Sequence, residues 1–175
     1  MLRLILLRHA KAATQASGSD AERPLTQRGR HEALRVGDYL ASLGLFPDLA
    51  VVSTAKRTRE TLELALETFG EPCPVTAEPQ LYLAELPTLL DMLHHLPPFV
   101  QVLLAVGHNP GFHDFALMMS GQGDPLARAR LEAGFPTAAF AVIDFAATNW
   151  SDVQPGTGVL DRFVTPGDPA QGQRL

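Results

Sequence analysis

The stretch Leu2-Arg3-Leu4-Ile5-Leu6-Leu7-Arg8-His9 decides the fold class, because its apolar run ends abruptly in an arginine and a histidine. A short apolar run of this kind is typical of a fully buried strand. It has too few apolar positions for a membrane span or for the core of a signal peptide with its small-residue cleavage site. The sequence therefore predicts a buried strand that places Arg8 and His9 at its carboxyl end.

Three further apolar runs have similar length and lie at 49–53, 102–107 and 138–145. Helical patterns lie between them, and strands that alternate with helices imply parallel crossovers. We therefore predict an α/β fold, a three-layer α/β/α sandwich with a mostly parallel central sheet and antiparallel pairs among the last strands. One domain is expected over 1–164, followed by a flexible tail at 165–175, where Pro, Gly, Gln and Asp give no core-forming pattern.

Helices are expected where apolar residues recur every three or four positions between capping and stop signals. Thr26 suits the N-cap of the first helix, and Gly44 suits its end. Asn109-Pro110 resembles a capping side chain followed by proline in the first helical position. The predicted helices run from Thr26 to about Leu43, from Ser53 or Thr54 to Gly70, over about Thr88 to Leu96, and from Asn109 through Met119.

Composition excludes several classes of function. The net charge of -5 argues against nucleic-acid binding, which depends on an excess of clustered lysine and arginine. Cys73 is the single cysteine, so the chain forms no internal disulfide and no thiolate metal cluster, which suits a reducing cytoplasm. No stretch is long and apolar enough to predict a membrane span.

Cationic side chains gather where the predicted strands end, which is where ligands bind in open α/β sheets. Arg8-His9 follow the first strand, and His108 follows the strand at 102–107. Lys56, Arg57 and Arg59 crowd the first turn of a helix, whose N-terminus is already the positive end of its dipole. A bound phosphate would relieve this repulsion, and without it at least one of these cations should turn into solvent.

His9 is the candidate nucleophile of a phosphoryl transfer, because a histidine with a reference pKa of about 6.5 is partly unprotonated at neutral pH. Arg8, Arg57 and His108 can stabilise the charge of the transferred group without magnesium, so we expect no metal and no cofactor. An Arg-His pair alone is more often structural than catalytic, so the hypothesis depends on the motifs that follow it.

Four ordered motifs carry a family resemblance. Leu6-Leu7-Arg8-His9-Ala10-Lys11-Ala12 resembles the Arg-His signature of the histidine phosphatase superfamily, which includes the phosphoglycerate mutases. The other three are similar in order and spacing to those of SixA-type phosphohistidine phosphatases. They are Asp20-Ala21-Glu22-Arg23-Pro24-Leu25-Thr26-Gln27-Arg28-Gly29, Ser53-Thr54-Ala55-Lys56-Arg57-Thr58-Arg59-Glu60-Thr61 and Gly107-His108-Asn109-Pro110-Gly111.

The resemblance implies a phosphoglycerate mutase-like fold and assigns roles by position. The nucleophile falls on His9, the phosphate-binding arginines on Arg8 and Arg57, and the second histidine on His108. Arg23 matches a further arginine that approaches the phosphate.

The sequence departs from the family pattern at several points. Ala10 replaces the glycine common in the wider superfamily, and Thr54 stands where proline or serine is frequent. Mutase-like relatives use an acidic residue after the third strand to protonate the leaving group. The corresponding segment of this chain offers only Glu78 and Glu85, of which Glu85 is the candidate proton donor. The same segment is short, so the site should be open.

An open site favours a phosphorylated protein, with phosphohistidine as the substrate and inorganic phosphate as the product. A phosphatase for small phosphomonoesters is the alternative, because the matched residues recognise only the phosphoryl group. A third hypothesis is a phosphate-binding module without turnover.

Overall fold

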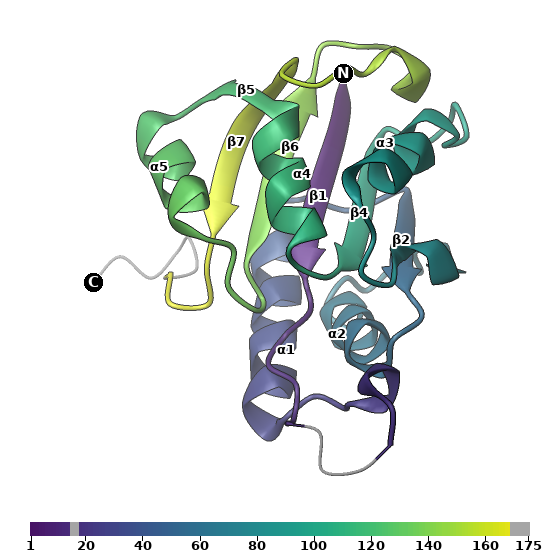
Figure 1. The fold of residues 1–175 in the computed structure, drawn as a ribbon, viewed down its shortest axis with the longest axis vertical. Helices are drawn as coiled ribbons and strands as arrows, with labels where there is room; N and C mark the ends of the chain where they lie inside the picture. Colours follow the sequence, from purple (N-terminus) through teal and green to yellow (C-terminus); the bar gives the residue numbers. More distant parts are fainter. Residues whose placement is uncertain (15–17, 169–175) are drawn as a thin grey trace.

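The computed structural model describes residues 1–14 and 18–168, which form one seven-stranded sheet covered by helices on both faces (Figure 1). The strand order is β3-β2-β4-β1-β6-β7-β5, with β1 at the centre. The strands are β1 (Leu2–Arg8), β2 (Leu49–Ser53), β3 (Val75–Glu78), β4 (Val102–Gly107), β5 (Ser120–Gly123), β6 (Phe140–Phe145) and β7 (Gly158–Val164).

The pairing directions confirm the predicted mostly parallel sheet. β1 and β2 flank β4 and both pair with it in parallel, and β3 and β5 also have parallel partners. β6 runs antiparallel to its neighbours β1 and β7, as expected for the last strands. In this register Arg8 lies opposite Gly107 and Val52 lies opposite Val106, so the carboxyl ends of β2, β4 and β1 meet at one edge.

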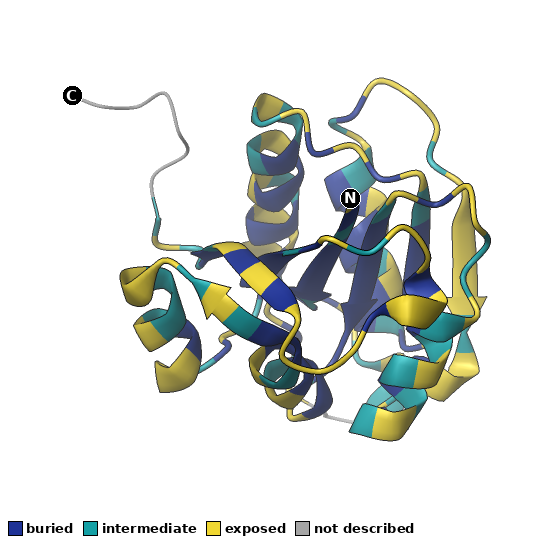
Figure 2. Ribbon diagram, turned by 90° about the horizontal axis from the view of Figure 1, so that it is seen from above, coloured by how far each residue is buried: buried dark blue, intermediate teal, exposed yellow. Residues whose placement is uncertain are grey.

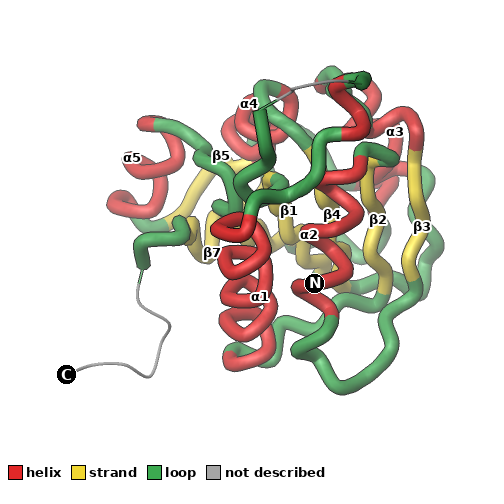
Figure 3. The backbone as a smooth tube through the Cα atoms, turned by 90° about the horizontal axis from the view of Figure 1, so that it is seen from below, coloured by secondary structure: helices red, strands yellow, loops and turns green. Residues whose placement is uncertain are grey.

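Two layers of helices cover the sheet (Figures 1 and 3). α1 (Gln27–Ser42) and α2 (Lys56–Leu66) lie on one face, and α3 (Leu86–His94), α4 (Gly111–Met119) and α5 (Pro125–Ala133) lie on the other.

The alternation of side chains along β1 explains why its apolar run is continuous. Leu4 and Leu6 pack into the core on the α3 and α4 face, whereas Ile5 and Leu7 pack into the core against α1 and α2. A strand covered on both faces needs apolar residues at every position. Figure 2 shows the central strands buried in this way, whereas β3 at the edge is mostly exposed.

Several predicted boundaries are confirmed and others are wrong. Thr26 caps α1 and accepts a hydrogen bond from the Gly29 N–H, and Gly44 follows the helix with a φ of 65°. α2 ends at Leu66, before the predicted stop at Gly70, and the residues between them form turns rather than helix. α3 runs two residues earlier than expected at both ends, and β6 begins only at Phe140.

The predicted capping role of Asn109 is wrong. Pro110 is the N-cap of α4, and the peptide bond between Asn109 and Pro110 is cis. The Asn109 side-chain amide donates instead to the carbonyl of Phe135 at 2.8 Å. Asn109 therefore ties the loop before β6 to the end of β4.

The Thr26–Gly29 turn holds the loop that follows β1. Both the backbone N–H and the hydroxyl of Thr26 donate to the carbonyl of Lys11, and Ala12 forms a bridge with Leu25. A Cβ atom on Gly29 would lie 2.1 Å from the Lys11 carbonyl oxygen. The glycine is therefore required by the close approach of this loop to α1.

Only the first part of the predicted tail is described. The Asp168 carboxylate accepts a hydrogen bond from the Thr165 N–H at 2.7 Å and pairs with Arg130 at 2.5 Å. The rest of the predicted tail, 169–175, lies outside the described residues. Across the part of the chain that is described, no helix has the length and apolar character needed to span a bilayer.

Replacement of Gly29 by alanine should destabilise the protein. Alanine normally stabilises a helix relative to glycine, but here the new methyl group meets the Lys11 carbonyl, and overpacking of this kind costs about 1–3 kcal/mol. Urea unfolding measures the difference. Gly167→Ala is the control, since its Cβ meets nothing within 4 Å and surface changes stay within about 0.5 kcal/mol. A Gly29→Ala protein as stable as the wild type would contradict this packing.

Candidate active site

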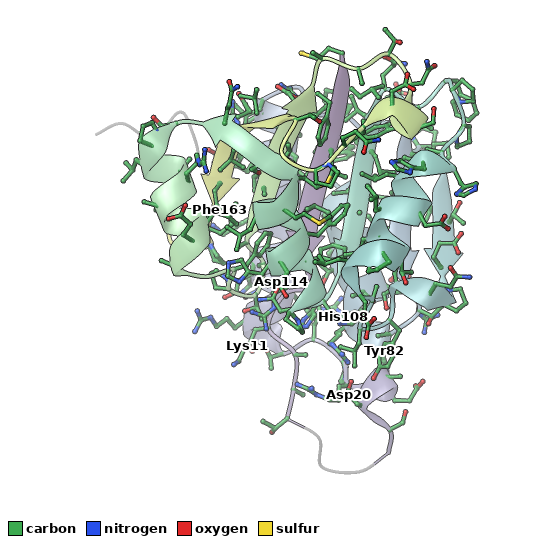
Figure 4. All side chains as sticks on the ribbon, turned by 45° about the horizontal axis from the view of Figure 1, so that its top comes forward. Lys11, Asp20, Tyr82, His108, Asp114 and Phe163 are labelled. Atoms are coloured by element: carbon green, nitrogen blue, oxygen red, sulfur yellow. The ribbon has the colours of Figure 1, made fainter. Side chains whose placement is uncertain are left out.

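A pocket of about 390 Å³ opens at the edge where β1, β4 and β2 end. Figure 4 shows Lys11, Asp20, Tyr82 and His108 gathered at this end of the molecule. The structure thus brings together five of the predicted residues from separate segments of the chain, namely Arg8, His9, Arg23, Arg57 and His108. The pocket is lined by Arg8, His9, Lys11, Ala12, Asp20, Arg23, Arg57, Leu83, His108, Asn109 and Thr137.

His9 is held in one tautomer. Its Nδ1 lies 2.8 Å from the carbonyl oxygen of Ala10, and because a carbonyl only accepts, Nδ1 carries the hydrogen. The lone pair of the neutral ring is therefore on Nε2. The Ala10 N–H in turn donates to the Thr61 hydroxyl on α2 at 3.0 Å, which fixes the backbone next to the imidazole. A neutral ring of this kind has the free nitrogen that a nucleophile needs.

Burial keeps His9 unprotonated. Its side chain lies inside the pocket wall, and this loss of solvation, together with the positive charges of Arg57 and Arg8, lowers the pKa of His9 to about 4. The hydrogen bond to the Ala10 carbonyl opposes the shift but does not cancel it. The imidazole is therefore neutral throughout the physiological range.

His108 is buried and has protein partners at both ring nitrogens. Arg57 Nη2 donates to Nδ1 at 3.2 Å, so Nε2 carries the hydrogen and donates to the Ser53 hydroxyl at 2.8 Å. Burial and the charge of Arg57 lower the pKa of His108 to about 3. The His9 and His108 rings lie 5.4 Å apart between centroids. In this structure His108 therefore orients the Arg57 guanidinium.

Arg57 is the most buried cation of the pocket, with only 3% of its surface exposed. Its Nη1 donates to the Asp20 carbonyl at 2.7 Å, and Nη2 also donates to the Asp20 carboxylate at 3.0 Å. Arg59, by contrast, is exposed, as predicted for at least one cation of this helix turn.

Two buried guanidinium N–H groups lack a partner. Among the described residues, neither Arg57 Nε nor Arg8 Nε forms a hydrogen bond, although Arg8 Nη1 donates to the Phe135 carbonyl at 2.8 Å. Buried donors in native proteins are nearly always paired, and an unpaired one calls for a specific explanation. Both Nε atoms are closed off from solvent in this structure, so an anion in the pocket would contact these arginines through other guanidinium nitrogens.

Asp20 is a site residue whose role was not predicted. Its carboxylate pairs with Arg23 at 2.8 Å and Arg57 at 3.0 Å, and it accepts a hydrogen bond from the Tyr82 hydroxyl at 2.6 Å. These hydrogen bonds and charges, that of Tyr82 first, hold the pKa of Asp20 far below its usual range. Asp20 is thus a carboxylate, not a carboxylic acid, at neutral pH.

Tyr82 and Ser53 were also missed. The Tyr82 ring packs edge-on against His108 at 5.4 Å, and the Arg57 guanidinium lies 5.9 Å from its centroid. Ser53 ends β2 and is buried under His108. The sequence held a signal for Asp20, which opens the second motif, and for Ser53, which ends a predicted strand. No sequence pattern pointed to Tyr82.

Arg23 and Glu85, the remaining predicted residues, have different outcomes. Arg23 lines the pocket, where its Nε donates to the Ala13 carbonyl at 2.7 Å. Glu85 is exposed, precedes α3 and is not among the lining residues, because the chain turns into α3 after Leu83. The structure does not place the predicted proton donor in the site, and the carboxylate found there belongs to Asp20.

Two further features of the site bear on its chemistry. Lys11 and Leu83 are exposed at its rim, so the pocket reaches the surface as expected. Within residues 1–14 and 18–168, no three His, Cys, Asp or Glu side chains gather in a metal-binding arrangement.

The buried histidines should make stability depend on pH. The pKa values of His9 and His108 fall from 6.5 to about 4 and about 3 on folding. Below about pH 6.5 the unfolded chain binds protons that the folded chain does not, so acid destabilises the fold, by up to about 1.4 kcal/mol per pH unit for each histidine. The free energy of unfolding in urea should be measured from about pH 4 to pH 6.5. It should fall less steeply with decreasing pH for His108→Gln than for the wild type. Equal slopes would mean that the His108 ring is protonated in the folded state.

Comparisons with known proteins show which family the chain resembles. Residues 4–85 match the model of the histidine phosphatase superfamily, branch 1. An uncharacterized protein of Mycobacterium tuberculosis is 33% identical over 162 residues, which cover 91% of this chain and 99% of the relative.

Solved structures extend the likeness to the whole fold. A protein of Agrobacterium tumefaciens assigned to the SixA phosphohistidine phosphatases is 33% identical, with a TM-score of 0.80 over 94% of this chain and 98% of its own. A SixA-assigned protein of Nakamurella multipartitia is 29% identical, also with a TM-score of 0.80, over 95% and 97% of the two chains. Sequence likeness over most of its length and a shared fold show that this chain belongs to the histidine phosphatase superfamily.

Proposed function

We propose that the protein is a metal-independent phosphatase that acts on phosphohistidine of a signalling or phosphotransfer protein, through a phosphoryl intermediate on His9. The observation that carries the proposal is that one pocket holds His9, with its lone pair on Nε2, together with the side chains of Arg8, Arg23 and Arg57. The SixA assignment of two structural relatives supports the same substrate class. We propose that the protein acts in a reducing cytoplasm.

In the first step, His9 Nε2 attacks phosphorus. The Nε2–P bond forms as the bond from phosphorus to the leaving group breaks, and the leaving group takes that electron pair. Charge on the transferred oxygens is stabilised by Arg8 and Arg57, with Arg23 at the edge of the pocket. These fixed charges give the positive environment that magnesium supplies in other phosphoryl transfers.

In the second step, water attacks the phosphorus of the intermediate. The Nε2–P bond breaks, the electron pair returns to Nε2, and inorganic phosphate leaves with the oxygen of the water. His9 keeps its Nδ1 hydrogen bond to the Ala10 carbonyl throughout, so the ring does not have to reorient. Splitting the reaction in this way replaces one difficult displacement by two easier ones.

The electrostatics of Asp20 favour a nitrogen leaving group. An alkoxide leaves poorly unless an acid protonates it, and Asp20, whose pKa is held far below neutrality, has no proton to give. In phosphohistidine the ring nitrogen that is not bonded to phosphorus can take a proton from solvent near neutral pH, so the ring leaves as neutral imidazole when the N–P bond breaks. Phosphohistidine therefore needs no acid from the protein, whereas an alkyl phosphomonoester does.

Small phosphomonoesters are the second candidate, because Arg8, Arg57 and His9 contact only the phosphoryl group in this proposal. A phosphate-binding module without turnover ranks below both, since His9 has the neutral form and free nitrogen that a nucleophile requires.

His9→Asn should abolish turnover while the protein stays folded. The asparagine amide can still donate to the Ala10 carbonyl but has no nucleophilic nitrogen, so release of phosphate from a phosphohistidine protein should fall at least about a thousandfold. His31→Asn is the matched control, because His31 is exposed on α1. Retained turnover in the folded His9→Asn protein would rule out the nucleophile.

Substrate preference tests the leaving-group argument. The ratio of kcat/KM for a phosphohistidine protein to that for an alkyl phosphomonoester should exceed about a hundred, the lower range for loss of acid catalysis. The measurement is initial-rate release of inorganic phosphate from both substrates. A ratio near one, or a preference for the alkyl ester, would assign the protein to small phosphomonoesters instead.

A further inference from the structure

Leu83 has a conformation that leucine rarely adopts, and it has it at the mouth of the pocket. Its φ is 51°, its side chain is 52% exposed, and it lines the same cavity as His9 and Arg57. The left-handed region costs free energy for a residue with a branched side chain. Such outliers persist where the surrounding structure fixes them, and they concentrate at functional sites.

The neighbours of Leu83 hold it in place on both sides. Leu81 is buried in the core, and the Tyr82 hydroxyl is bound to Asp20. Ala84 is buried, and its carbonyl lies so close to α4 that a Cβ on Gly111 would be 2.1 Å from it. The chain between these anchors therefore directs the Leu83 side chain outward at the rim.

Leu83 is also chemically out of place among the groups around it. Of the described residues that line the pocket, Leu83 alone has a large apolar side chain; the others are charged, polar or alanine. A leucine contributes nothing to binding a phosphoryl group. Since Leu83 is at the rim, it suits the part of the substrate that remains outside when the phosphoryl group is held by the arginines.

We infer that Leu83 is a specificity-determining residue that packs against the ring of the leaving group. The inference rests on the proposed function, under which that ring is the imidazole of phosphohistidine. An apolar side chain at the rim gains free energy by covering the ring face, whereas the phosphoryl group is recognised by charge alone. Leu83 thus distinguishes leaving groups that have a ring from those that do not.

The test compares two substrates with the same bond to phosphorus. Free phosphohistidine has a ring in its leaving group, and phosphoramidate, which releases ammonia, has none. Leu83→Asn removes the apolar surface, and asparagine tolerates a positive φ. The ratio of kcat/KM for phosphohistidine to that for phosphoramidate should fall roughly tenfold in this variant, mainly through KM. Because both values come from one preparation, the ratio does not depend on how much protein is folded.

A second exposed leucine provides the control for the Leu83 variant. Leu126→Asn alters an exposed leucine that does not line the pocket, and it should keep the wild-type ratio. An unchanged ratio in Leu83→Asn would overturn the inference. If the wild type hydrolyses phosphomonoesters but no phosphohistidine, the proposed function fails. The ratio for p-nitrophenyl phosphate against acetyl phosphate then decides the role of Leu83 by the same criterion.

Discussion

The guanidinium of Arg57 is buried at the centre of the pocket, and the other polar groups of the site are arranged around it. Asp20 binds it through a backbone carbonyl and a carboxylate, and His108 accepts from it through Nδ1. Burying a charge is costly unless it is paired and hydrogen-bonded. The guanidinium also lines the pocket that contains His9 and Arg8, which puts a fixed positive charge beside the proposed nucleophile.

This arrangement also sets the protonation of the groups nearby. The positive charge of Arg57 adds to burial in keeping both histidines neutral, and it adds to Tyr82 and Arg23 in keeping Asp20 ionised. Burial, the Tyr82 hydroxyl and the surrounding arginines thus act together to keep His9 neutral and Asp20 ionised. This combination suits a substrate whose leaving group can be protonated by solvent.

Much of the fold and part of the site could be predicted from the sequence, for physical reasons. The apolar runs of β1, β2 and β4 are continuous because both faces of these strands are covered, and Arg8, His9 and His108 follow them directly. By contrast, β3 is exposed and β5 includes two glycines, so neither has the apolar pattern of a strand. α5 has only one fully buried residue, Leu131, and therefore a weak helical pattern.

The unpredicted parts of the site depend on contacts distant in sequence. The Tyr82 hydroxyl reaches Asp20 across 62 positions, and the Ser53 hydroxyl reaches His108 across 55. Glu85 is the acidic residue that the sequence offers in this segment, but Leu83 rather than Glu85 lines the pocket. No local pattern encodes which of two neighbouring side chains faces a cavity.

The central claim is that the phosphoryl group passes through His9, and trapping that intermediate tests it most directly. The full-length protein would be mixed with a phosphohistidine protein, quenched in alkali during turnover, and analysed by peptide mass spectrometry and phosphorus NMR. The account predicts a phosphoryl group on Nε2 of His9 that forms and decays as fast as phosphate is released. Turnover without an adduct on His9, or with the phosphoryl group on another residue, would contradict it.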